Sequence, residues 1–184
     1  MKITEHPLRF QNSHEWRNWL DEHHAREKEA WLVIKKNHIT HAGVFYEEAI
    51  EEAVCFGWID GFMKSLDAET YVLRFTPRKR GSIWSVSNQQ RVTRLIEQGR
   101  MTEAGMETVR DAQASGEWEA ALRREDVTNI PDDLRAALEN NPQGLAGFER
   151  LPASQKKQLL YWLDSAKTEQ TRQKRIIKIV IMAS

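Results

Sequence analysis

The chain has 184 residues, of which 40% are hydrophobic and 29% are charged, a composition typical of a folded globular protein and not of a disordered one. Its 27 basic and 27 acidic residues cancel, which excludes a bulk attraction to DNA or anionic lipid and leaves only local patches for such binding. The single cysteine, Cys55, excludes an internal disulfide. No apolar run approaches the ~20 residues that span a bilayer, and residues 1–16 lack the apolar segment of a secretory signal. We therefore expect a cytoplasmic protein without a membrane span.

The first predicted elements are a helix and a strand. Trp16 and Trp19 recur at helical spacing and predict a helix that runs to about Ala25. Ser13 can cap the start of this helix. Residues 31–34 are rich in the branched and aromatic side chains that favour a strand.

A loop over residues 37–45 and a second helix follow. Residues 46–56 place their apolar side chains on one face and four glutamates on the other, which is typical of an amphipathic helix. Gly57 stands where a left-handed end to this helix is expected.

Residues 58–66 and 71–77 resemble two strands joined by a four-residue loop, 67–70. Together with residues 31–34 they indicate a small antiparallel sheet of about three strands. Everything after them has a helical pattern. The sequence therefore predicts an α+β protein with its strands and packed helices in the first half and a helical C-terminal half.

The loop length implies a register for this hairpin, with Leu66 opposite Tyr71 and Phe62 opposite Phe75. The alternation of side chains then places Asp60 on the same face as these aromatic residues. A carboxylate in such a place must be hydrogen-bonded or paired. Asp60 is accordingly either an acid, base or ligand anchor, or a structural carboxylate bonded to backbone amides or to an arginine.

The helices that follow carry recognisable end signals. Ser87 and Gln90 form a capping box for a helix that stops at Gly99, and Thr102 caps another that ends near Gly116.

Three more helices are expected, beginning at residues 129–133, covering 154–166, and running from Thr168 to the C-terminus. A charged stretch of weak periodicity precedes the first of them. We expect an α+β domain over 1–125 and a helical module over 126–184, packed on the first.

The last helix is amphipathic. Its apolar arc consists of Ile176, Ile177, Ile179, Val180 and Ala183, and its basic arc of Lys167, Lys174, Arg175 and Lys178. Such helices sometimes lie on membranes, but more often they pack on their own domain under long cationic side chains. Arg172 projects close to the apolar arc, where it could pair with a carboxylate such as Asp60.

One stretch, RFTPRKRGSIWS from Arg74 to Ser85, is strongly basic. Residues 70–96 contain no acid and six cations, which are Arg74, Arg78, Lys79, Arg80, Arg91 and Arg94. Such a local positive field survives a net charge of zero.

Two kinds of binding and one bland alternative fit this stretch. Arg78, Arg80, Trp84 and Asn88, with Asp60 nearby, could bind an anionic small molecule or protein partner. Arginines interleaved with aromatic residues also suit single-stranded nucleic acid. Alternatively, the basic residues pair with the region 103–139, which has ten acids and four cations.

No metal site or cofactor site is predicted. His38 and His41 form an isolated pair in a loop without the closed set of ligands that zinc needs. The chain has no phosphate-binding loop, dinucleotide fingerprint, nucleophile elbow or metalloprotease motif. An enzyme that uses Asp60 with an arginine stays a third hypothesis, the weakest because no nucleophile accompanies it.

Four stretches carry a family resemblance: YEEAIEEAVCFGWIDG (46–61), RFTPRKRGSIWSVSN (74–88), GRMTEAGM (99–106) and WLDSAKTEQTRQKRI (162–176). They resemble the YdeI/OmpD-associated family, often labelled bacteriocin-protection proteins. The resemblance implies a role in tolerance of bacteriocins or cationic antimicrobial peptides, and the label suggests a porin partner. The lack of an export signal argues against direct contact with a porin. The resemblance carries over no catalytic residue, and it adds Arg172 to the candidate ligand-site residues Asp60, Arg78, Trp84 and Asn88.

Overall fold

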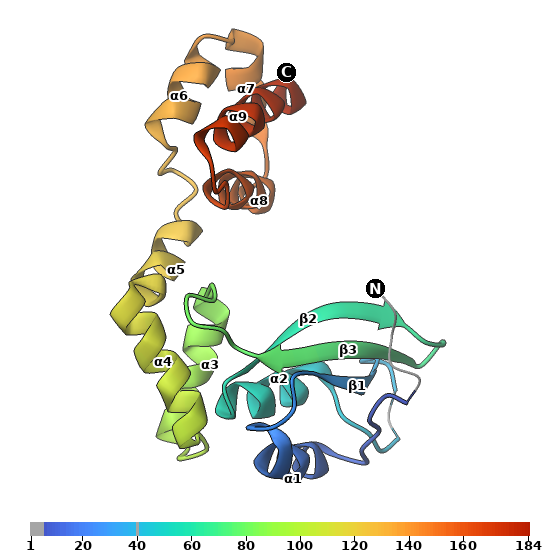
Figure 1. The fold of residues 1–184 in the computed structure, drawn as a ribbon. Helices are drawn as coiled ribbons and strands as arrows, with labels where there is room; N and C mark the ends of the chain where they lie inside the picture. Colours follow the sequence, from blue (N-terminus) through green and yellow to red (C-terminus); the bar gives the residue numbers. More distant parts are fainter. Residues whose placement is uncertain (1–5, 40) are drawn as a thin grey trace. The chain divides into compact units, whose positions relative to one another are not determined.

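The computed structural model describes residues 6–39 and 41–184. Two parts of the sequence predictions lie outside the described residues. They are residues 1–5, which belong to the segment considered as an export signal, and residue 40 of the predicted loop. The elements are α1 (Ser13–His23), β1 (Ala30–Lys35), α2 (Tyr46–Cys55), β2 (Trp58–Ser65), β3 (Thr70–Pro77), α3 (Val86–Glu97), α4 (Glu103–Ser115), α5 (Glu117–Glu125), α6 (Asp132–Glu139), α7 (Pro142–Arg150), α8 (Ala153–Asp164) and α9 (Glu169–Ala183) (Figure 1). They form two compact units, a first unit up to Trp118 and a second unit from Glu119.

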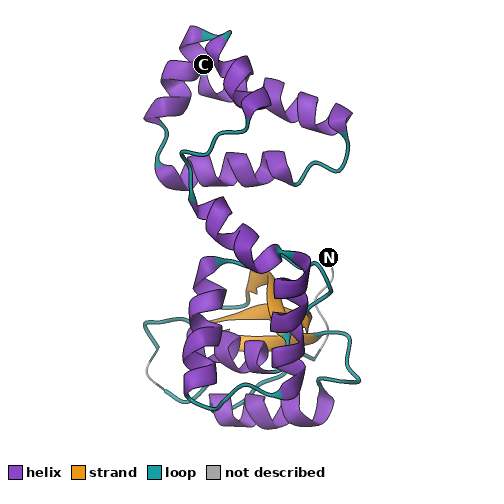
Figure 2. Cartoon of the chain, turned by 90° about the vertical axis from the view of Figure 1, so that its left-hand side faces the viewer, coloured by secondary structure: helices purple, strands orange, loops and turns teal. Residues whose placement is uncertain are grey.

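The strands of the described residues all belong to the first unit and form one antiparallel sheet in the order β1-β3-β2. The middle strand, β3, pairs with β1 so that Leu32 faces Leu73 and Ala30 faces Phe75. The elements after β3 are all helices, and the strands of the described residues gather in one place in the structure (Figure 2). The predicted α+β class, with three strands in the first half and a helical second half, is confirmed.

The predicted register of the β2–β3 hairpin is wrong because β2 contains a bulge. The register shifts between Asp60 and Met63, so that two residues of β2 face a single residue of β3. Phe62 is therefore turned away from Phe75, and its ring lies 6.0 Å from that of Trp31. Asp60, which precedes the bulge, lies opposite Phe75, in the position that the predicted register had given to Phe62.

The turn of this hairpin also begins one residue earlier than predicted. Ser65, and not Leu66, is the last residue of β2. Asp67 explains the early turn, because its Oδ1 accepts hydrogen bonds from the backbone N–H groups of Glu69 (2.9 Å) and Thr70 (2.6 Å). A short acidic side chain that bonds the backbone in this way competes with continued strand pairing.

The core of the first unit lies between the sheet and two helices, α1 and α2, which lie beside each other (Figure 1). Trp16 of α1 is completely buried, and its ring centroid lies 5.4 Å from that of Phe75. Its indole Nε1 donates to the carbonyl of Ala49 in α2 (3.1 Å), which satisfies the polar atom of a buried tryptophan. One residue thus connects α1 with both the sheet and α2.

Helix starts were predicted from capping side chains, with mixed success. Thr102 caps α4 as predicted. The cap of α1 is Asn12 and not Ser13, and the cap of α3 is Ser85 and not Ser87. In both corrected cases the capping oxygen accepts from the N–H three residues later, because the earlier residue has the extended backbone that a cap requires.

The second unit has its own core around Phe148, which is 1% exposed. α5 and α7 were not predicted; α7 is capped by Asn141 and begins with Pro142. Gly147 lets α7 approach α9, because a Cβ atom at this position would lie 1.7 Å from the carbonyl oxygen of Ala183. The other buried members of this core are Leu134, Leu138, Leu160, Leu163, Ile176 and Ile179.

The helices are short compared with a bilayer. The longest in the described chain, α9, has 15 residues, whereas a span needs about 20. Within residues 6–39 and 41–184 none has the length and apolar character to cross a membrane.

Candidate anion site after strand β3

The basic loop between β3 and α3 is anchored at both ends. At its start the backbone N–H of Arg78 donates to the carbonyl of Gly57 (2.8 Å). In the middle, Ser82 N–H donates to the carbonyl of Lys79 (2.9 Å) across a turn in which Gly81 has φ +72°. At its end Ser85 caps α3.

Arg78 is the buried cation of this loop, with 9% of its surface exposed. Its guanidinium carbon lies 3.9 Å from the ring centroid of Trp84, and Nη1 donates to the carbonyl of Ile83 (2.9 Å). The other terminal nitrogen, Nη2, is buried without a hydrogen-bond partner in the described residues. Burying a charged donor without a hydrogen-bond partner costs free energy of folding, so an acceptor bound to Nη2 would stabilise this arrangement.

Burial and the carboxylate of Asp60 shift the pKa of Arg78 in opposite directions. Burial lowers the pKa of Arg78 to about 10, and the negative charge of Asp60 acts in the opposite direction. At neutral pH the guanidinium is still fully charged. It therefore offers a cation with an unused donor.

Trp84 forms the wall against which Arg78 lies. It is 2% exposed, and its ring centroid lies 5.1 Å from that of Trp118. Gln89 of α3 ties down the backbone of Trp118, since its Nε2 donates to the carbonyl of that residue. Because Trp84 and Phe75 are both buried, neither offers a face on which a nucleic-acid base could stack.

A small pocket lies beside Arg78. The loop supplies Arg78, Lys79, Arg80, Gly81, Ser82 and Trp84, and α4 supplies Thr108, Asp111 and Ala112. Its volume of about 10 Å³ leaves room for roughly one water molecule. A larger anion would have to bind at its mouth, where the exposed side chains of Lys79 and Arg80 lie.

Arg80 and Asp111 are only weakly paired. Arg80 Nε lies 3.9 Å from Asp111 Oδ1, and the Arg80 side chain is 82% exposed. An exposed pair at this distance contributes little. Three cations and one carboxylate thus line the pocket, which keeps its field positive.

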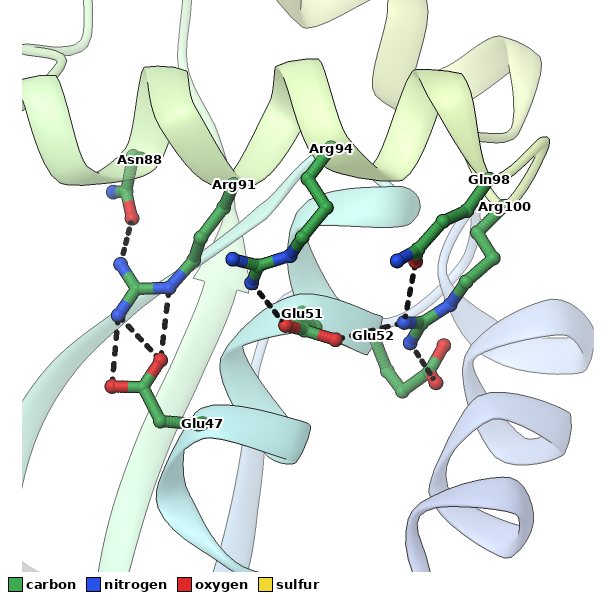
Figure 3. Close-up of polar contacts among 8 residues, drawn as sticks. All are labelled: Glu47, Glu51, Glu52, Asn88, Arg91, Arg94, Gln98 and Arg100. Carbon is green, nitrogen blue, oxygen red and sulfur yellow. Dashed lines mark hydrogen bonds and ion pairs between the residues drawn. The ribbon is translucent and has the colours of Figure 1, made fainter.

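The other cations of the basic stretch are neutralised by acids of the protein. Arg74 pairs with Glu29 (2.7 Å), outside the acidic region that we had expected to supply partners. Arg91 makes a bidentate pair with Glu47, and Arg94 bonds Glu51 (Figure 3). Among the ion pairs of the described residues, that of Arg80 with Asp111 is the one that joins this stretch to residues 103–139. The predicted continuous positive patch is therefore reduced to the loop around Arg78.

Asn88 does not join this pocket. Its side-chain oxygen accepts from Arg91 Nη1 (2.9 Å), which orients the guanidinium toward Glu47 (Figure 3). Its backbone N–H donates to the cap of α3, Ser85. Asn88 positions an ion pair between α3 and α2, which corrects its predicted place beside Arg78.

The same contact between α2 and α3 continues into a more buried network. Glu52, whose side chain is 8% exposed, binds Arg17 (2.6 Å) through one oxygen and Arg100 (2.7 Å) through the other. Arg100 also binds Glu51 (2.8 Å), which in turn binds Arg94 (Figure 3). These alternating charges connect α1, α2 and α3.

Asp60 lies near Arg78 but is engaged elsewhere. It is half-buried on β2, and its Oδ2 accepts a hydrogen bond from the hydroxyl of Tyr46 (3.3 Å). Burial, and after it the charge of Asp60, raises the pKa of Tyr46 to about 12. Tyr71 is affected in the same direction by the same two causes. Asp60 therefore acts on the Arg78 pocket through its charge and does not line it.

Replacing Asp60 with asparagine is expected to lower the pKa of Tyr46 from about 12, without returning it to the ordinary value near 10, since burial is the larger cause. An absorbance titration of phenolate formation, with Tyr46→Phe to assign the signal, measures this. Because folding raises this pKa, the stability that Tyr46 contributes is complete below about pH 10 and is lost as the pH rises through about 12. An unchanged titration in Asp60→Asn would contradict the placement of the carboxylate beside Tyr46.

Arg172 belongs to the second unit and has partners there. Its Nη2 and Nε bond the two oxygens of Asp133 (2.9 and 2.5 Å), and Nη1 lies 3.4 Å from Asp164. The expected pairing of Arg172 with Asp60 is therefore wrong, because acids next to α9 in its own fold take up the guanidinium. Arg172 connects α9 to the start of α6 and to the end of α8.

Histidines and acids do not gather into a metal site in the part of the chain that the structure describes, where no three of His, Cys, Asp and Glu could hold an ion together. His41 of the predicted pair instead lies 3.2 Å from Glu69. Cys55 is buried, and burial raises the pKa of its thiol.

Sequence reasoning found Arg78, Arg80 and Trp84, which the structure brings together in one pocket, and missed what surrounds them. Thr108 and Asp111 complete the pocket from α4, and Trp118 supports Trp84. Thr108 and Asp111 are three residues apart and so share one face of their helix. The sequence shows this spacing, but it does not indicate that this face of α4 packs against the loop between β3 and α3.

Two family models match the chain. Residues 8–108 match a family described as a domain of unknown function, DUF8412. Residues 128–184 match a family described as bacteriocin-protection, YdeI or OmpD-associated. The second match confirms the predicted resemblance for the part that contains WLDSAKTEQTRQKRI, whereas the other three motifs lie within the first match. Neither a curated protein nor a solved structure matches the chain.

Proposed function

Since the chain belongs to the DUF8412 family and its residues 128–184 match the bacteriocin-protection, YdeI or OmpD-associated family, we propose that it is a stress or defence protein of the bacteriocin-protection type. In this proposal it acts by binding an anionic group of a small molecule or protein partner, without catalysis. The anion binds at the loop of Arg78, Lys79, Arg80 and Trp84.

The observation that carries the proposal is the unused donor of Arg78. Its guanidinium is stacked on Trp84 and bonded through Nη1, so that its position is determined before any ligand arrives. Nη2 still needs an acceptor. A phosphate or carboxylate at the mouth of the pocket would supply one by placing a single oxygen in the water-sized space beside Arg78, with a charge-assisted bond that is stronger than one to a neutral acceptor.

Binding suits these groups better than proton transfer does. Arginine and lysine hold an anion at neutral pH but do not exchange protons there. The one carboxylate of the pocket, Asp111, faces Arg80. Lys79 and Arg80 are exposed and can steer an anion toward the mouth of the pocket.

Inorganic pyrophosphate serves as the probe. Calorimetric titration of the full chain is expected to detect binding that weakens as the salt concentration rises. Arg78→Lys is expected to weaken this binding about tenfold or more, because lysine lacks the second terminal nitrogen. The exposed double variant Lys79→Gln/Arg80→Gln is expected to weaken it as well without disturbing the core, and Lys64→Gln on β2 is the control with an exposed cation elsewhere.

Other outcomes would count against the proposal. If pyrophosphate does not bind, or if binding is equal in Arg78→Lys, in the exposed double variant and in the wild type, then Nη2 needs no more than a buried water molecule. A single-stranded oligonucleotide that binds with the same dependence on Lys79 and Arg80, in the absence of pyrophosphate binding, would favour the nucleic-acid alternative instead.

A further inference from the structure

The outer face of α9 exposes apolar side chains that its own unit does not cover. Ile176 and Ile179 point into the core and are 3% and 0% exposed. Ile177, Ile181 and Met182 are instead 58%, 68% and 69% exposed. The prediction that Ile177 belongs to the packed arc is therefore wrong, because only part of the apolar surface of this helix is needed for the core.

Basic side chains accompany these apolar ones. Lys174 and Lys178 are exposed on the same helix, and Arg175 lies over the ring of Trp162 from α8, 5.1 Å from its centroid. Within the described residues none of these three cations makes an ion pair with a carboxylate. Arg175 donates hydrogen bonds to the carbonyl of Trp162 and to Ser165 Oγ. Together with Thr171, Ile177 and Ile181 these residues line an open hollow that contains no acid.

We propose that this face, made of Lys174, Ile177, Lys178, Ile181 and Met182, attaches the protein to the surface of an anionic phospholipid bilayer. Exposed aliphatic side chains can enter the boundary between headgroups and acyl chains, while lysines on the same helix reach the lipid phosphates. The half-buried Trp162 at the edge of the hollow has the amphipathic character of a residue at that boundary.

The exposures favour a bilayer over other partners. A groove for a partner helix holds its apolar side chains recessed between walls, whereas Ile181 and Met182 are more than two-thirds exposed. A bilayer accepts such protruding side chains without a matching shape. A symmetric pairing with a second copy would bring Lys174 and Lys178 against their own counterparts, which like-charge repulsion opposes.

The expected strength follows from the number of cations. Each lysine or arginine at an anionic surface increases binding about fivefold, which corresponds to about 1 kcal/mol. Two lysines therefore contribute about twenty- to thirtyfold, and the aliphatic side chains add to this. Attachment should be reversible and sensitive to salt.

Co-sedimentation of the full chain with vesicles tests the proposal. Binding is expected to vesicles that contain phosphatidylglycerol and to be much weaker to vesicles of phosphatidylcholine alone. Lys174→Gln/Lys178→Gln is expected to lower the binding about twentyfold, and Ile177→Ser/Ile181→Ser is expected to lower it at unchanged charge. Lys28→Gln/Lys64→Gln, two exposed lysines of the first unit, is the matched control and should bind like the wild type.

Three results would overturn it: no binding to the anionic vesicles, equal binding to both kinds of vesicle, or an equal loss in the control and in Lys174→Gln/Lys178→Gln. Competition by an acidic amphipathic peptide that binds in place of lipid would assign the face to a protein partner. Arg78→Lys should bind vesicles normally, so failure at the loop after β3 and failure at α9 can be told apart.

Discussion

Replacing Glu52 with alanine is expected to destabilise the first unit by about 3 kcal/mol, because it removes the shared partner of two arginines. Glu52 is 8% exposed at its side chain, whereas Arg17 and Arg100 are 28% and 33% exposed. The partial exposure of the arginines, and the bond that Arg100 keeps with Glu51, place the loss at the lower end of the range for buried ion pairs. Urea denaturation followed by circular dichroism measures it.

Glu47→Ala is the matched control, because it removes another glutamate of the same helix that binds an arginine, Arg91. Its side chain is 64% exposed, so its loss is expected to cost less than about 1 kcal/mol. Equal effects of the two substitutions would mean that burial does not decide the strength of this network. Glu52→Gln, which keeps the shape and loses the charge, should lie between them.

Replacing Phe148 with alanine is expected to destabilise the second unit by about 3–5 kcal/mol, the usual cost of removing a large aromatic side chain from a packed core. Phe148 is 1% exposed, and the buried residues of its cluster all belong to this unit. A small unit has little stability to spare, so its amides should exchange with solvent much faster. Hydrogen exchange of peptides from α6 to α9 measures this.

Leu122→Ala supplies the comparison for this variant. Leu122 lies in α5 and is 62% exposed, so that its truncation removes little buried surface and should change exchange only slightly. Similar acceleration in both variants would contradict the assignment of Phe148 to the centre of the core.

The parts of the fold that sequence predicted well depend on neighbouring residues. Thr102 caps α4 because its own side chain reaches an N–H three residues away, and Thr168 begins α9 in the same way. The strands were found because β-branched and aromatic residues gather in them. Where two neighbouring residues could both cap a helix, as Asn12 and Ser13 could for α1, the sequence does not show which one does. The path of the chain that enters the helix decides which residue takes the extended backbone.

In the candidate site, too, contacts between residues close in the chain could be predicted, and contacts between distant residues could not. Arg78 and Trp84 are six residues apart in one loop, so their meeting followed from the local sequence. The fates of Arg91 and Arg94 did not, because their carboxylates lie 44 and 43 residues earlier in the chain. Arg172 finds Asp133 across 39 residues. The local sequence shows these arginines without a neighbouring acid, and only the packing of the helices shows which acids they pair with.

By itself the sequence determined the α+β class, the order of the strands and of most helices, the absence of an internal disulfide and the family resemblance of its C-terminal part, because each of these resides in composition or in short-range patterns. The tertiary structure decided the bulge that turned Phe62 away, the neutralisation of all but one short part of the basic stretch, and the exposure of Ile177 on α9. These outcomes depend on which surfaces meet, and an ion pair or a buried face exists only when residues far apart in the chain are brought within a few ångströms of each other.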